Sequence, residues 1–163
     1  MNINELSRKE IELDKKISIL EGSIDDKRTQ IKLLGIPEEY FAIHKEYSDL
    51  ANNDIEALKR GLFLQWFYIV EPPFLTGIFE LDEIAQDKII KILNDLILSN
   101  SIDYELKQML KHYKEWNYVY ERFAHYKSFY NLIFNSEKND FEKFYKFETE
   151  NRGLMGIYWS SLF

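Results

Sequence analysis

The hydrophobic pattern is sharpest in residues 3–34, where apolar side chains recur at heptad spacing. With Ile3 at position a, eight of the ten a and d positions are apolar. Isoleucine at a with leucine at d is typical of two-stranded parallel coiled coils. The pattern predicts one long helix with a heptad seam formed by Ile3, Leu6, Leu13, Ile17, Leu20, Ile24, Ile31 and Leu34.

A heptad seam indicates a helical partner, but it does not say which chain supplies that partner. A helix over residues 3–34 would extend about 48 Å, which exceeds the roughly 35 Å diameter expected for the rest of the chain. Part of such a helix would project from the domain. We therefore give equal weight to a homodimer through residues 3–34 and to a hairpin in which this helix packs on later helices of its own chain.

A second strong feature is the apolar run over residues 62–70, which is interrupted only by Gln65 and the hydroxyl of Tyr68. A helix that is hydrophobic on every side must be enclosed by other helices. We predict that residues 54–71 form the central helix of a domain over residues 36–163. Its end is set by two consecutive prolines, and residues 1–35 form a separate N-terminal element.

The rest of the chain predicts further helices over residues 37–51, 82–98 and about 101–134, with continuity through Lys114 and Glu115 left open, and a last one that starts at Asp140. Gly35 and Pro37 mark the first boundary, and Asp82 is a favourable N-cap. The apolar segment 74–79 is expected to pack under the core, and the apolar tail 154–159 to dock on the body or on a partner. The sequence thus predicts an all-α domain of about six helices.

Composition agrees with a packed helical protein. The 163 residues include 12 Phe and 11 Tyr but only 6 Gly and 3 Pro, which argues against disorder and against a turn-rich β fold. There is no Cys, the N-terminus has no apolar h-region of a signal peptide, and no apolar stretch has the length of a membrane span. We expect a cytoplasmic protein that does not bind membranes.

The net charge of −7 is concentrated in the middle of the chain. Residues 36–99 contain 12 acidic and 5 basic residues, whereas the two flanking segments are balanced. An acidic surface disfavours binding to nucleic acid and favours a basic protein partner. The same acidity is also explained by a need for solubility alone.

No motif in the sequence predicts a catalytic, cofactor-binding or metal-binding residue. The three histidines, His44, His112 and His125, fall on different predicted helices and lack the close spacing of metal ligands. There is no nucleophile elbow, no Walker A loop and no dinucleotide-binding loop. We therefore predict no cofactor and no metal, and we favour a protein that is not an enzyme.

Two groups of residues remain as candidates for binding. Gln65, Tyr68 and Glu71 follow one side of the central helix and would form the polar floor of a small-molecule pocket, although we favour the interpretation that Gln65 and Tyr68 are satisfied buried polar groups. The aromatic-rich C-terminal half contains more rings than one helical face can bury. The candidates for a protein interface are Tyr118, Tyr126, Phe129 and Trp159.

These patterns favour a non-catalytic module that binds a basic protein stoichiometrically. Small size, acidity, absence of Cys and absence of catalytic motifs are the profile of a bacterial immunity protein or another inhibitor, and also of many regulatory proteins. The alternative is a small-molecule sensor or an enzyme with an interhelical pocket around Gln65, Tyr68 and Glu71.

Overall fold

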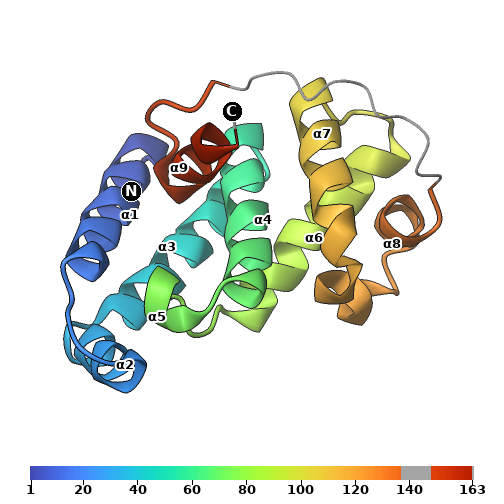
Figure 1. Ribbon diagram of the computed structural model, residues 1–163. Helices are drawn as coiled ribbons and strands as arrows, with labels where there is room; N and C mark the ends of the chain where they lie inside the picture. The colour runs from blue at the N-terminus through green and yellow to red at the C-terminus, as the bar shows by residue number, and fades with distance from the viewer. Residues whose placement is uncertain (137–147, 163) are drawn as a thin grey trace.

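The computed structural model describes residues 1–136 and 148–162, and these two ranges contain helices and no strand (Figure 1). The all-α prediction is therefore confirmed for the described chain. The helices, in order, are α1 Ile3–Ser18, α2 Ile24–Leu33, α3 Ile36–Leu50, α4 Ile55–Val70, α5 Pro73–Thr76, α6 Glu83–Leu98, α7 Tyr104–Tyr113, the 3₁₀ helix η1 Lys114–Phe123, α8 Lys127–Phe134 and α9 Gly153–Ser161.

Helix α4 occupies the centre of the domain, as its apolar run predicts. Every residue from Ala57 to Trp66 is buried, and α3, α6 and α9 pack around the helix. The Asp54 side chain caps its first turn by accepting from the backbone N–H groups of Glu56 and Ala57. The helix ends before Pro72, because a residue that precedes proline is disfavoured in the α conformation.

The prediction of one continuous helix over residues 3–34 is wrong. The chain leaves the helical conformation after Ser18 and starts a new helix at Ile24, so that α1 and α2 are separate elements (Figure 1). Gly22 has a φ of 107°, and Ser23 forms a capping box with Asp26. This local start signal overrides a heptad spacing that continues in register across the break.

The heptad seam of α1 faces the body of the domain. Leu6, Leu13 and Ile17 are buried, and the helix packs against α3, α5 and α9. Ile31 of α2 is buried, whereas Ile24 of the same helix and Leu34, which directly follows it, are each about half exposed. A parallel coiled-coil homodimer would need all of these side chains at one surface, so this fold leaves no continuous seam for it.

The predicted helix over about 101–134 is divided into three parts. Helix α7 begins after Asp103, whose carboxylate accepts from the N–H of Leu106, and it passes into η1 at Lys114. Trp116 has non-helical dihedral angles and kinks η1, and α8 then packs against α6. The last predicted helix, which starts at Asp140, begins outside the described residues.

The apolar tail docks on the body of the domain, which is one of the two predicted alternatives. It forms α9, which lies between α1 and α4 (Figure 1). Leu154, Met155 and Trp159 are buried in this contact. Within the described parts of the chain, no helix has both the length and the apolar character needed to cross a membrane.

Candidate functional site

A hollow of about 560 Å³ lies on the surface where α2, the start of α3 and the connection between α5 and α6 meet. We call it the Phe79 hollow, and its lining consists of Lys32, Pro37, Glu38, Phe41, Phe79 and Glu80. Apolar rings and charged groups alternate in this lining. Such a surface suits a side chain with an apolar stem and a charged end.

The start of α3 forms one wall of the hollow. Gly35 adopts a left-handed conformation with a φ of 68°, which turns the chain from α2 into α3. Pro37 lies in the first turn of α3, where its missing N–H costs no helical hydrogen bond. Glu38 follows and is exposed, and Phe41 lies about one turn further along the helix.

The segment after α5 forms another part of the lining. Gly77 ends α5 with a φ of 75°, and a Cβ atom at this position would lie 2.6 Å from Cδ1 of Ile17. Glycine is therefore required both for the turn and for the close approach to α1. The next residue, Ile78, is fully buried and anchors the segment, and this leaves Phe79 partly exposed and Glu80 exposed.

Two cations already lie over the Phe79 ring. Nζ of Lys32 is 5.1 Å from the ring centroid, and Cζ of Arg28 is 5.8 Å from it. Both distances are within the range of about 6 Å in which the negative face of an aromatic ring attracts a cation. The hollow therefore has an aromatic surface that accepts positive charge.

The two carboxylates of the hollow differ from other acids nearby because they form no ion pair within the described chain. Glu39 of α3 pairs with Lys9 at 3.4 Å, and Asp49 of the same helix pairs with Lys88 at 2.9 Å. Neither Glu38 nor Glu80 forms an ion pair with any residue that the structure describes. Their charge is available to an external cation.

The three residues of the predicted small-molecule pocket do not all lie together in the structure. Gln65 is buried; its Nε2 donates to the carbonyl oxygen of Gln86 at 3.3 Å, and its Oε1 lies 3.4 Å from Nε2 of His44. The Tyr68 hydroxyl also donates to Gln86, at 3.5 Å. Burial lowers the pKa of His44 to about 4, so this histidine is neutral at neutral pH. Gln65 and Tyr68 thus belong to a hydrogen-bonded contact between α4 and α6.

Glu71, the third predicted pocket residue, does not join that contact. It lies close enough to Tyr158 of α9 to influence its ionisation: burial and, after it, the charge of Glu71 raise the pKa of Tyr158 to about 12. The Tyr158 hydroxyl is in turn 2.6 Å from Nε2 of His112. The structure therefore brings together two of the three predicted residues and places the third at a different helix pair.

Of the four predicted interface aromatics, two are buried and two are at least partly exposed. Phe129 and Trp159 are buried: the Phe129 ring packs edge-on against Tyr120, and Trp159 packs in the same way against His112. These two are core residues, because α8 and α9 fold their apolar faces onto the domain. Tyr118 is 55% exposed, and Tyr126 is partly exposed, with its hydroxyl donating to Asp87 at 2.7 Å.

A second concentration of charge lies inside the fold, where α1, α4, α7 and α9 meet. We call it the polar junction, and it consists of Glu10, Glu56, Arg60, Glu105 and Arg152. Arg152 donates to both carboxylate oxygens of Glu56, at 2.7 and 2.6 Å, and also to Glu105. Arg60 donates from Nε to Glu56 at 2.8 Å. Glu56 and Glu105 therefore each have a cationic partner within the chain.

The two arginines also control the ionisation of Glu56. Burial alone would raise the pKa of this carboxyl. The hydrogen bonds and charges of Arg152, followed by those of Arg60, outweigh burial and hold the pKa of Glu56 below its usual value. Glu56 is thus a charged structural group, held between two guanidinium groups.

Glu10 forms the other part of the polar junction and caps α9 from a distant helix. Its carboxylate accepts a hydrogen bond from the Tyr47 hydroxyl and, at 2.9 Å, one from the backbone N–H of Leu154. Gly153 has a φ of 61°, and a Cβ there would lie 2.6 Å from the carboxylate. Burial raises the pKa of Glu10 to about 7, against the lowering effect of these hydrogen bonds and of Arg60.

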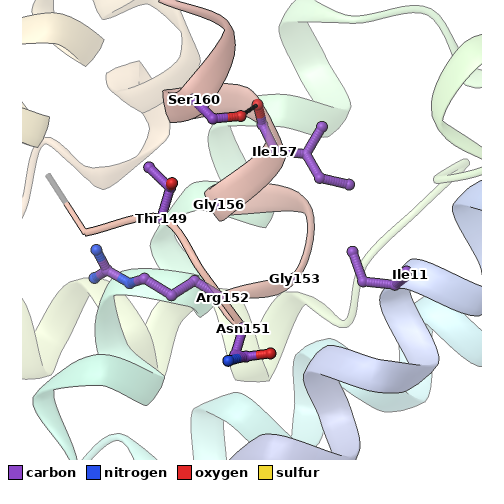
Figure 2. Close-up of a pocket in the computed structure, with 8 residues that line it drawn as sticks. All are labelled: Ile11, Thr149, Asn151, Arg152, Gly153, Gly156, Ile157 and Ser160. Carbon is purple, nitrogen blue, oxygen red and sulfur yellow. Dashed lines mark hydrogen bonds between the residues drawn. The ribbon is translucent and has the colours of Figure 1, made fainter. Parts of the chain in front are cut away.

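A smaller hollow of about 190 Å³ lies beside α9 (Figure 2). Figure 2 shows Ile11 of α1 on one side of the hollow and the Arg152 side chain extending away from it. That guanidinium is occupied in the polar junction, so it is not available to a ligand. The lining consists of Ile11, Thr149, Asn151, Arg152, Gly153, Gly156, Ile157 and Ser160.

No family model matches the chain, and neither a curated protein nor a solved structure is significantly similar to it. The structure alone therefore identifies the Phe79 hollow as the candidate site. The sequence pointed to the acidic segment that contains Glu38 and Glu80, but it did not indicate Lys32, Phe41 or Phe79 as site residues. A sequence feature that could have indicated Phe79 is the apolar segment 74–79, which ends at this residue. The Phe79 ring is partly exposed in the structure.

Proposed function

We propose that this protein is a non-catalytic binding module that captures a basic protein partner, with the Phe79 hollow at the centre of the interface. The observation that supports this most directly is a pair of carboxylates without ion pairs, Glu38 and Glu80, beside a partly exposed aromatic ring. Charge complementarity at such a site accelerates association and excludes acidic proteins.

The aromatic lining supports the same proposal. Phe41 and Phe79 provide apolar area that is removed from water on binding. Burial of such area is the usual source of affinity at the centre of a protein interface. The acids at the edge then favour positively charged partners over others. A stoichiometric inhibitor needs these two properties and needs no catalytic group.

Among proteins that act in this way, bacterial immunity proteins and other inhibitors of basic enzymes fit the size and charge of the chain. Regulatory proteins that bind a basic partner fit as well. The proposal is therefore a mode of action, namely capture of a basic protein through the Phe79 hollow and its two carboxylates.

The test is affinity capture of the tagged protein from its native cell lysate, followed by mass spectrometry. We expect one dominant basic protein at stoichiometric yield. The double variant Glu38→Gln with Glu80→Gln should lose it, whereas Glu39→Gln, which removes an equally exposed acid on the same helix, should keep it. An elution without a stoichiometric partner, or a partner retained by the double variant, would contradict the proposal.

The alternative function is a small-molecule sensor or enzyme that uses Gln65, Tyr68 and Glu71. Less supports it, because Gln65 and Tyr68 are engaged with Gln86 and Glu71 lies at another helix pair. Loss of a small-molecule activity in folded Gln65→Leu and Tyr68→Phe variants would count for this alternative. Unchanged capture of a basic protein by the same variants would count against it.

A further inference from the structure

The lining of the Phe79 hollow is specific enough to indicate which side chain of the partner it receives. This inference rests on the proposed function and refines it. We propose that the hollow binds one arginine side chain of the basic partner, and that Lys32 occupies the position of this cation in the free protein.

The ring of Phe79 is the first reason. It already has a lysine ammonium 5.1 Å and an arginine guanidinium carbon 5.8 Å from its centroid, supplied by Lys32 and Arg28. Of these two, only Lys32 is among the residues that line the hollow. The ring therefore attracts cations of both chemical types, and one of them lies where an incoming side chain would have to bind.

The balance of charge is the second reason. Two carboxylates and one ammonium line the hollow, and the Arg28 guanidinium lies over the same ring, 5.8 Å from its centroid. These four charges balance, so an incoming cation has to take the place of Lys32 on the ring. The charge balance therefore fits one basic side chain and not a basic patch.

Arginine fits this lining better than lysine. Its planar guanidinium can stack on an aromatic face and donate in its plane to two carboxylates at once, whereas an ammonium acts as a compact point charge. Glu38 and Glu80 come from two different segments that line the hollow, and a planar group with five donors has enough donors to serve both. Pro37 and Phe41 provide apolar contact for the alkyl stem.

Lys32 then acts as an internal competitor. Its ammonium occupies the ring that the partner's guanidinium needs and reduces the negative potential of the hollow. Replacing Lys32 with Met keeps most of the stem but removes the charge. This substitution should strengthen the binding of an external cation, which is the opposite of what is expected if Lys32 merely supports the walls of the hollow.

The test is an NMR titration of the full-length protein with N-acetyl-arginine amide, followed through the backbone amide signals of residues 35–41 and 77–81. N-acetyl-citrulline amide is the matched control, because it has nearly the same shape without the charge. A single side chain is expected to bind in the millimolar range, so ligand is added to about 50 mM. We expect saturable shifts with arginine amide, weaker binding of lysine amide and no saturable shift with citrulline amide.

Variants sharpen the result. Lys32→Met should bind arginine amide about threefold more tightly, and Glu38→Gln with Glu80→Gln about tenfold more weakly, while Glu39→Gln should stay within about twofold of wild type. The amide spectrum of each variant shows whether it is folded. Equal binding of the arginine and citrulline ligands, shifts located elsewhere, no saturable shift, or weaker binding by Lys32→Met would each overturn the inference.

The outcomes also separate this inference from the proposed function. If a basic protein is captured through Glu38 and Glu80 but arginine amide does not bind in the hollow, the function stands and the arginine inference fails. If arginine amide binds as expected but no protein partner is captured, the proposed function fails.

Discussion

The polar junction and the Phe79 hollow both combine carboxylates with basic side chains, but they use charge in different ways. In the polar junction, Arg152 and Arg60 donate to Glu56 from two sides, and the charges are satisfied within the chain. In the Phe79 hollow, Glu38 and Glu80 form no ion pair with the described residues, although Lys32 lines the same hollow. The first arrangement holds helices together, and the second leaves charge for another molecule.

The largest expected effect comes from breaking the polar junction. Arg152→Met removes a guanidinium that serves both Glu56 and Glu105 and leaves their charges less compensated. Removing one partner of a buried ion pair typically costs about 3–5 kcal/mol. Glu56 keeps Arg60 and Glu105 keeps Lys59 as cationic partners, so we expect a loss in the lower part of this range, about 3–4 kcal/mol, in the free energy of unfolding. Urea denaturation measures this quantity.

Arg28→Met is the matched control for that variant, because it removes a guanidinium that lies over Phe79 at the surface. An exposed cation over a ring contributes about 0.5–1 kcal/mol, so the control should remain close to wild type. Equal losses for the two variants would show that the polar junction is no more important for stability than a surface contact.

The second prediction concerns the pH dependence that Glu10 introduces. Its pKa is about 7 in the folded protein against an ordinary value of 4.5, so the folded state binds this proton more tightly than the unfolded state. The contribution of this tighter proton binding to the free energy of unfolding is fully present below about pH 4.5 and is lost as the pH rises to about 7. The difference is about 3 kcal/mol.

His44 and His112 have pKa values lowered to about 4, and they impose the opposite slope between pH 4 and 6.5. The measurement is therefore the difference in unfolding free energy between wild type and Glu10→Gln. This difference should fall by about 3 kcal/mol from pH 4.5 to pH 7. A difference that stays constant with pH would show that Glu10 is not protonated in this range.

A smaller effect is expected from the hydrogen-bonded contact around Gln86. Gln65→Leu leaves the carbonyl oxygen of Gln86 and Nε2 of His44 without this partner in a buried position. Leaving a buried polar group unsatisfied costs about 1–3 kcal/mol, and we expect about 2 kcal/mol in urea denaturation. A stability close to that of wild type would indicate that Gln65 has no structural role and would revive the pocket interpretation.

Much of the fold was predictable because local signals set it. Asp82 predicts the start of α6, and the pair Gly35 and Pro37 predicts the start of α3, in agreement with the structure. The break between α1 and α2 was missed because the heptad spacing continues through it, although Ser23 and Asp26 form a recognisable capping box. A regular hydrophobic spacing reports which side is buried, but it does not report whether the helix is continuous.

The candidate site was less predictable because it depends on contacts between distant segments. Sequence reasoning placed the acidic excess in residues 36–99, but it did not show that Glu39 is neutralised by Lys9 while Glu38 is not. The same limitation applied to the aromatic residues. The composition showed that there are more rings than one face can bury, but only the folded chain shows that Phe129 is inside and Tyr118 outside.

The smallest expected effect on stability belongs to the Phe79 hollow. The double variant Glu38→Gln with Glu80→Gln removes two exposed charges that have no ion pair to lose, and exposed charges contribute little to folding. We expect its unfolding free energy to change by less than about 0.5 kcal/mol. Urea denaturation under the conditions used for Arg152→Met provides the comparison.

This near-neutral result is informative because it separates binding from folding. If capture of the basic partner is lost while stability is unchanged, the carboxylates of the hollow act on the partner and not on the fold. A loss of stability similar to that of Arg152→Met would mean that Glu38 and Glu80 are structural after all, and the contrast between the two regions would no longer hold. Charge that costs nothing to remove from the folded protein is therefore the charge most directly available for recognition.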